Sequence, residues 1–279
     1  SDIMVPLRLA GVGVEIEPGV GPVLDHPYRT RESIDELASH RYGEGSWTDS
    51  TGRTRDCGEG VQCVRDGVAS AVRELGSTPL IGFGGAPFTL AAYMVEGRPS
   101  RDHLAARALA ASDPGAWDAL MSWCARVSAD FITSQVEAGA SVAQLFDSWV
   151  GSLSPRTYRE SVAPYSRMVA QRVSGAVSLL AGLGLAAGRA PRTNATILAT
   201  LNVPLTVVNN PVWAVKGTKA RKEALSGLLR GAAVGAGLAL ATVDRQGKPS
   251  LAWRMRNSRQ QREAIQAARE TVRQRYVTA

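Results

Sequence analysis

The chain changes composition abruptly near residue 168, and this change constrains its fold more than any other feature. Residues 1–168 hold 15 Lys and Arg against 21 Asp and Glu, a net charge of −6. Residues 169–279 hold 17 against 4, a net charge of +13, with all four lysines and none of the three histidines. One domain rarely changes charge this sharply, so we predict two parts of separate origin. The overall charge of +7 is an average of the two and does not indicate a nucleic-acid partner.

The first part has the features of a reduced, cytosolic protein. Cys57, Cys63 and Cys124 form no C-x-x-C pair and no even disulfide framework. Residues 1–11 have no initiator Met, no basic stretch and no apolar signal core, so they do not resemble a targeting peptide. We expect that the chain begins in the middle of a motif.

Residues 79–148 alternate between strand and helix patterns. The apolar residues 80–83 precede Gly84-Gly85, and Pro87 is suited to the first turn of a helix. Asp113-Pro114 predicts a second helix start, 142–146 predicts the next strand, and Ser154-Pro155 opens another helix. This order favours a parallel sheet with crossover helices.

Residues 39–63 interrupt that order. Gly, Arg, Asp, Ser and Thr dominate, and neither the helical nor the strand periodicity appears. The segment is either a surface loop or a non-native insertion such as a local frameshift.

Three uncharged, largely apolar runs follow Met168. They span 173–188, 193–215 and 231–243, and the middle run has 23 residues, enough to cross a bilayer core of about 30 Å. Trp213 near its end suits an interfacial anchor. Buried helices of a soluble bundle would look similar, so both interpretations stay open. The Arg- and Gln-rich tail over 254–279 predicts a solvated basic helix.

Three blocks carry a resemblance to a known family. They are SDIMVPLRLAGVGVEIEPGVGP (1–22), GFGGAPFTLAAYMVEG (82–97) and QLFDSWVGSLSPRTYRE (144–160). In this order and spacing they resemble the uroporphyrinogen decarboxylase family, over residues 1–38 and about 64–168. The resemblance implies an α/β fold: a partial (β/α)8 barrel of the TIM type over residues 1–168, with 39–63 as an atypical segment.

The resemblance also implies a reaction. Uroporphyrinogen III loses CO2 from four acetate side chains and becomes coproporphyrinogen III, without cofactor or metal. A pyrrole carbon accepts a proton before CO2 departs, so positive charge develops on the ring. A carboxylate that accepts hydrogen bonds from the pyrrole N–H groups stabilises that cation.

The resemblance assigns three site residues. Asp2 corresponds to the catalytic carboxylate that also binds substrate, Tyr93 to a tyrosine that contacts a substrate carboxylate, and Ser148 to a substrate-binding serine. Glu96 and Asp147 are expected to support their neighbours. Outside the resemblance, His26 and His40 are expected in loops and His103 in a helix. None of the three has a metal-ligand spacing.

Two blocks of the family do not appear in this chain. One is an arginine-bearing block before the Asp2 motif, and the other is a late block that contains a histidine. We therefore expect an open part-barrel that folds poorly and is inactive. A homodimer is the usual state where the resemblance holds.

Residues 172–279 resemble the DoxX family of small membrane proteins. The blocks are SGAVSLLAGLGLAAGRAPR (174–192), LNVPLTVVNNPVW (201–213) and ALATVDRQGKPSLAWR (239–254). This implies an all-α, transmembrane segment with membrane association through 172–243. Three hypotheses follow: a decarboxylase, a DoxX-like membrane protein that carries a decarboxylase remnant, or an inactive fusion product.

Overall fold

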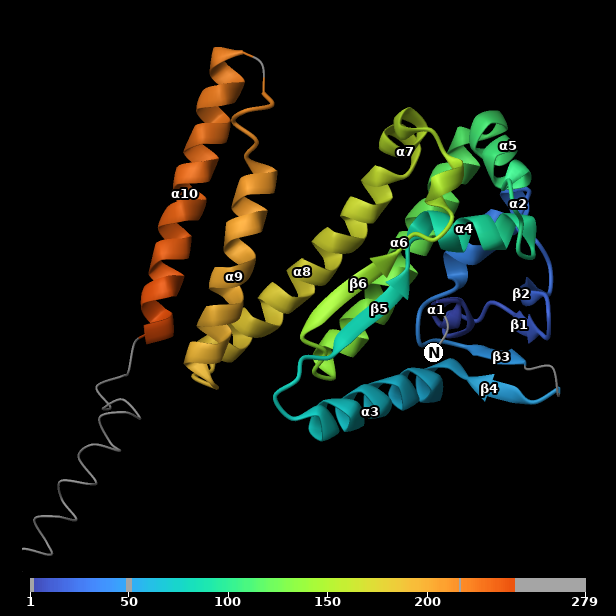
Figure 1. Cartoon of the computed structure of the whole chain (residues 1–279), viewed down its shortest axis with the longest axis horizontal. Helices are drawn as coiled ribbons and strands as arrows, with labels where there is room; N and C mark the ends of the chain where they lie inside the picture. Colours follow the sequence, from blue (N-terminus) through green and yellow to red (C-terminus); the bar gives the residue numbers. More distant parts are fainter. Residues whose placement is uncertain (1–2, 49–51, 216, 244–279) are drawn as a thin grey trace, which may run out of the picture. The chain divides into compact units, whose positions relative to one another are not determined.

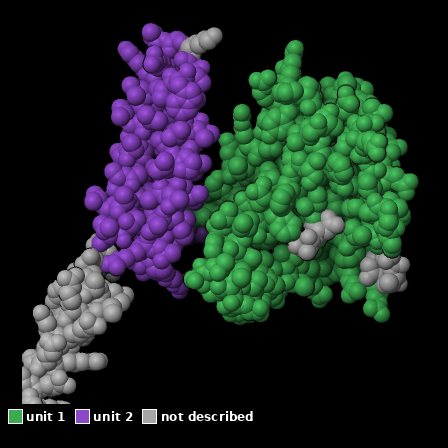
Figure 2. All heavy atoms as spheres, in the orientation of Figure 1, with its two compact units in different colours: residues 1–179 green, residues 180–279 purple. Residues whose placement is uncertain are grey.

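The computed structural model describes residues 3–48, 52–215 and 217–243. The chain divides into two compact units, Ser1–Leu179 and Leu180–Ala279 (Figure 2). The sequence placed the change of composition between residues 168 and 172, whereas this division falls further along the chain, within a long helix. The two units are described separately.

Unit 1 begins with short elements that pack on a central helix. Helix α1 (Val5–Arg8) precedes the antiparallel hairpin of β1 (Val14–Glu17) and β2 (Gly21–Leu24). Helix α2 (Arg31–Glu36) starts with a capping box between Thr30 and Ser33 and continues into the 3-10 turn η1 (Leu37–Ser39). The capping box satisfies backbone donors that would otherwise have no partner at the helix start.

Residues 39–63 contain more regular structure than the sequence suggested. Strands β3 (Ser46–Thr48) and β4 (Thr54–Asp56) form an antiparallel hairpin, and helix α3 (Cys57–Leu75) begins directly after it. Asp56 caps α3, because its side chain accepts a hydrogen bond from the Glu59 amide at 2.8 Å. Since β4 is exposed on both faces, it has no alternation of apolar and polar residues for the sequence to reveal.

The alternation predicted for 79–148 is confirmed at the elements that matter for the site. Strand β5 (Ile81–Gly85) pairs in parallel with β6 (Val142–Phe146), with Gly85 opposite Phe146. Between them lie helices α4 (Pro87–Glu96), α5 (Leu104–Ser112) and α6 (Pro114–Glu137). Pro87 stands in the first turn of α4, and Asp113 caps α6.

Helix α6 packs closely on β5 because two strand positions on that face are glycines. A Cβ added to Gly82 would lie 3.2 Å from Gln135 Oε1, and one added to Gly84 would lie 3.1 Å from Ile132 Cγ1. The side chain of Gln135, only 5% exposed, donates to Phe83 O at 2.8 Å and accepts from Phe83 N at 3.1 Å. These contacts fix β5 against α6, and Figure 1 shows the two elements next to each other.

The core of unit 1 lies between α4, α6 and the N-terminal elements. Helix α4 is buried along almost its whole length. The segment after β2 forms hydrogen bonds with the C-terminal end of α4. Tyr28 N donates to Met94 O and Arg29 Nε donates to Val95 O, both at 2.8 Å. These bonds satisfy carbonyl groups that a helix end leaves without partners. The largest fully buried side chains are Phe88, Phe131, Met4, Leu7, Leu37, Leu90, Met94, Leu120, Met121, Val12, Val14 and Val95.

After β6 the chain forms the 3-10 turn η2 (Val150–Ser152), helix α7 (Pro155–Ser161) and the long helix α8 (Ala163–Ala186). Helices α9 (Pro191–Asn209) and α10 (Thr218–Val243) then lie side by side within unit 2 (Figure 1). Gly227, Gly231 and Gly235 of α10 face side chains of α9, because an added Cβ at each would collide with Asn210, Thr206 and Asn202, respectively.

The described residues form a mixed α/β protein in which helices dominate, and they include a single parallel pair of strands. Two helices, α8 and α10, are long and apolar enough to cross a membrane by length and composition alone. The sequence favoured 193–215 for this role, but α9 ends at Asn209 and contains Pro204. It is not among the helices that meet the criterion in the described part of the chain.

The contact between Gln135 and β5 gives a first prediction. Gln135→Met keeps a similar shape but leaves the two Phe83 backbone groups without this partner. We expect the free energy of unfolding of unit 1 to fall by about 1–3 kcal/mol, measured by urea denaturation. Gln62→Met on the exposed face of α3 is the control, with an expected change within about 0.5 kcal/mol. Equal changes in the two variants would contradict this role for Gln135.

Candidate functional site

The carboxyl ends of β5 and β6 bring together the residues that follow both strands. The Ala86 amide donates to Phe146 O at 2.8 Å, so the pairing extends one residue beyond β5. Helix α4 begins immediately after β5, and Asp147, Ser148 and Trp149 form the turn after β6. Parallel strands with crossover helices place ligand sites at this edge of the sheet.

Thr89 connects the two strand ends. It lies in the first turn of α4 and is fully buried. Its hydroxyl donates to Asp147 Oδ1 at 2.9 Å, and the Trp149 amide donates to the same hydroxyl at 3.4 Å. Thr89 therefore holds the residues on both sides of Ser148.

Asp147 carries an unsatisfied buried oxygen. Its Oδ2 atom is inaccessible to solvent and has no hydrogen-bond partner among the described residues. Burial raises the pKa of the Asp147 carboxyl, and hydrogen bonds from the hydroxyl and backbone of Thr89 oppose that rise. A buried carboxylate oxygen without a donor is costly, and such groups cluster at functional sites.

Aromatic rings surround this turn. The Trp149 ring lies 5.7 Å from the Tyr93 ring and 4.9 Å from the His103 ring, measured between centroids. His103 is 2% exposed, and its Nδ1 has no hydrogen-bond partner in the described chain. Burial lowers the pKa of this imidazole below its ordinary value, against the opposing effect of Glu96 and Asp102. Burial therefore favours the neutral form of the ring.

The structure connects two of the three predicted site residues through Trp149. Tyr93 is buried on α4 and its ring touches Trp149, the residue after Ser148, which is exposed in the turn. Asp2 lies outside the described residues. Its neighbour in the chain, Ile3, places its carbonyl oxygen 3.0 Å from the position of an added Cβ on Gly85, at the carboxyl end of β5.

The remaining candidates differ in role. Glu96 stabilises α5, since its Oε1 accepts from the Ala106 amide at 3.1 Å in the first turn of that helix. The sequence predicted that His103 lies in a helix, and this prediction is wrong. The residue precedes α5 as the N-cap with a φ of 49°, because its buried ring packs between Phe88 and Trp149. Within residues 3–48, 52–215 and 217–243, no group of three or more His, Cys, Asp or Glu is placed to hold a metal ion.

Sequence reasoning missed Thr89 and Trp149. The signal for Thr89 was available, because a hydroxyl in the first turn after a strand lies beside the residues that follow the neighbouring parallel strand. Trp149 and His103 come into contact only through tertiary packing. They lie far apart in the sequence, so neither the helical nor the strand periodicity relates them.

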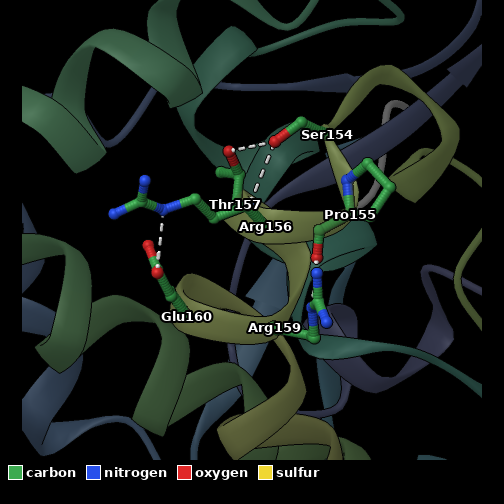
Figure 3. Close-up of polar contacts among 6 residues, drawn as sticks. All are labelled: Ser154, Pro155, Arg156, Thr157, Arg159 and Glu160. Atoms are coloured by element: carbon green, nitrogen blue, oxygen red, sulfur yellow. Dashed lines mark hydrogen bonds and ion pairs between the residues drawn. The ribbon is translucent and has the colours of Figure 1, made fainter.

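The local structure after β6 fixes where the turn ends. The Ser154 hydroxyl accepts from the Thr157 amide at 3.1 Å and so caps α7 (Figure 3). Arg156 pairs with Glu160 at 3.0 Å, and Arg159 donates to Pro155 O at 3.1 Å. The segment between β6 and this cap is short, so the position of Ser148 is limited at both ends.

The fold and the strand-end site define a mixed α/β protein with a parallel-strand site of the kind that α/β enzymes use. The family model of uroporphyrinogen decarboxylase (URO-D) matches residues 1–182. The chain belongs to this family.

Curated relatives agree with the family model. The chain is 52% identical over 166 residues to a uroporphyrinogen decarboxylase of Arthrobacter sp. (strain FB24), covering 60% of this chain and 44% of the relative. It is 53% identical over 166 residues to that of Leifsonia xyli, covering 60% and 41%. It is 49% identical over 176 residues to that of Streptomyces coelicolor, covering 63% and 45%. The chain thus spans less than half the length of these relatives.

The raised pKa of Asp147 gives a second prediction. A carboxyl whose folded pKa lies above its unfolded value of 3.8 stabilises the fold most at low pH, and that stability is lost as pH rises through the folded pKa. Asp147→Asn removes this loss while Thr89 can still donate. We expect a higher thermal midpoint than wild type at pH 7 and no such gain below about pH 4. Calorimetry across pH, with the exposed Asp35→Asn as control, measures this; a lower midpoint at pH 7 would oppose it.

Proposed function

We propose that unit 1 forms part of a site that binds uroporphyrinogen for cofactor-free decarboxylation to coproporphyrinogen. The family membership supports the reaction class. The observation that carries the proposal for this chain is the convergence of Tyr93, the Ser148 turn and Ile3 at the carboxyl ends of β5 and β6.

Asp2 is proposed as the catalytic carboxylate. Protonation of a pyrrole carbon leaves a cationic ring, and a carboxylate that accepts from the pyrrole N–H groups stabilises that cation in the transition state. Asp2 precedes Ile3, whose carbonyl lies beside Gly85. An added side chain at Gly85 would meet this carbonyl, so glycine is needed for the approach.

Tyr93 and Ser148 are proposed to bind substrate carboxylates. Their hydroxyls come from α4 and from the turn after β6, and Thr89 ties these two elements together. Among the described residues, no hydrogen-bond partner reaches Asp147 Oδ2 in the same turn. We propose that Asp147 and Thr89 position the turn rather than contact the reacting carbon.

The exposed face of the β5–β6 sheet supports the proposal that the site belongs to a complete barrel. The face of β5 and β6 opposite α6 presents Ile81, Val142 and Phe146, which are 58%, 52% and 43% exposed. In a closed barrel such a face is covered by the inward side chains of further strands. We propose that further strands complete the barrel, that the described pair binds substrate weakly without turnover by itself, and that a homodimer is the assembled form.

The third prediction tests binding with the full chain. Under anaerobic conditions, uroporphyrinogen should quench tryptophan fluorescence in a saturable way, because Trp149 adjoins the proposed site. Asp2→Asn, Tyr93→Phe and Ser148→Ala should each raise the dissociation constant about tenfold, the effect of one hydrogen bond to a charged group. Tyr158→Phe on α7 is the matched control. Absent binding, or equal effects in the control, would refute the site. Chromatography should detect no coproporphyrinogen.

A second candidate function concerns unit 2, for which we propose membrane association. The glycines of α10 bring its backbone against polar side chains of α9, which is the packing that apolar surroundings favour, since lipid provides no hydrophobic force between helices. Exposed apolar side chains lie along α10 from Leu225 to Val243, including Leu229 at 62% and Leu240 at 70%. The charged residues of α10 lie in its first two turns, apart from Arg230. The likeness to the DoxX family remains a prediction.

The fourth prediction tests this association. The full chain, expressed in cells, should stay in the membrane fraction after alkaline carbonate extraction. Val234→Lys lies within the uncharged run 231–243 of α10, where a charge costs about 3 kcal/mol near the centre of a bilayer, and should shift the chain to the soluble fraction. Leu104→Lys, at a residue 66% exposed in unit 1, is the control. A soluble wild-type chain without detergent would exclude the membrane assignment.

A further inference from the structure

Unit 1 contains a second polar hollow, away from the strand ends. It has a volume of about 400 Å³ and lies between the segment after η1, the middle of α6 and the first half of α8. Its lining is formed by Ala38, His40, Arg41, Tyr42, Trp123, Arg126, Val127, Asp130 and Arg172. The decarboxylase proposal uses none of these residues.

Positive charge is concentrated in this hollow. Three arginines come from three different elements, and the carboxylate of Asp130 is the single acidic group in the lining. Asp130 pairs with Arg172 at 3.2 Å. Arg41 donates to Ala38 O at 2.7 Å, and neither Arg41 nor Arg126 has a carboxylate partner among the described residues. The lining therefore has a net charge of +2.

The arginines repel one another. Partial burial lowers the pKa of Arg126, and the nearby charges of Arg41 and Arg172 lower it further. Like charges that converge on a partly dry cavity destabilise the fold unless an anion joins them. This arrangement is more typical of a binding site than of a stabilising surface network.

The other walls are rigid and partly apolar. Trp123 Nε1 donates to His40 O at 3.1 Å, which fixes the segment that carries Arg41 on α6. Tyr42 bonds Ser134 at 3.0 Å through its hydroxyl, and His40 donates from Nδ1 to Ala10 O at 3.0 Å. The indole of Trp123 and the side chain of Val127 are available to cover an organic group.

We propose that this hollow binds a small organic phosphate monoester. Its dianionic phosphate matches the two uncompensated charges, and guanidinium groups bind phosphate oxygens in pairs. The volume leaves room for a small carbon skeleton beside the phosphate. This site is independent of the decarboxylase site in residues and in chemistry.

Phenyl phosphate is the probe, titrated into the full chain at low salt with heat and tryptophan fluorescence as readouts. We expect saturable binding, weakened at least tenfold by Arg126→Gln and by Arg41→Gln, since each removes a charge-assisted contact. Arg126→Lys keeps the charge but not the paired donors, so its affinity should lie between those of wild type and Arg126→Gln. Asp130→Asn should increase the affinity several-fold, because it removes the one opposing charge. Arg73→Gln, an exposed arginine on α3, is the matched control.

Stability separates binding from a structural role. Arg126→Gln should unfold at a thermal midpoint no lower than wild type, since the lost charge was unfavourable where it stood, while phenyl phosphate should no longer raise that midpoint. Absence of saturable binding, equal loss in Arg126→Gln and Arg73→Gln, or weaker binding in Asp130→Asn would overturn the proposal. A self-association that Arg126→Gln abolishes, without phosphate binding, would assign the hollow to an acidic protein surface and would equally overturn it.

Discussion

The close contact between α6 and β5 is the constraint on which the rest of unit 1 depends. Gly82 and Gly84 leave no side chain on the face of the strand that α6 covers, so the helix approaches until Ile132 and Gln135 touch the backbone. The Gln135 amide then bonds both backbone groups of Phe83. A side chain at either glycine would push the helix away and shift β5, and with β5 the start of α4 and the strand ends.

The candidate site follows from this packing. Once β5 and β6 are in register, Thr89 can reach Asp147, and Trp149 can reach both Tyr93 and His103. The arrangement leaves two buried polar atoms, Asp147 Oδ2 and His103 Nδ1, without a hydrogen-bond partner in the part of the chain that the structure describes. A core selected for stability alone would satisfy or remove them. Their presence beside the strand ends is therefore better explained by a ligand-binding role than by folding.

Much of this could be predicted from the sequence, and the reasons for the gaps are physical. Proline at helix starts, the Asp113 cap and the apolar strand runs are local signals, so β5, β6, α4 and α6 were predicted close to their observed positions. The β3–β4 hairpin was not predicted, because exposed strands lack alternation. Tyr93 and Ser148 were predicted as site residues from family motifs alone, since no periodicity marks them, and their roles stay predictions. The pairing of Thr89 with Asp147 and the arginine hollow depend on residues far apart in the chain, which only the fold brings together.

The two units use glycine in different ways, and this bears on what surrounds each of them. In unit 1, glycine lets an apolar helix cover a strand, and the buried partners are mainly hydrocarbon. In unit 2, glycine of α10 lets Asn202, Thr206 and Asn210 reach the helix backbone, while Leu and Val side chains face outward. The contact also has an apolar part, because Val203, Val207 and Leu228 line the space between the same two helices. Polar side chains packed on a helix backbone gain most where water does not compete for their hydrogen bonds, and this is the physical reason for the membrane association proposed for unit 2.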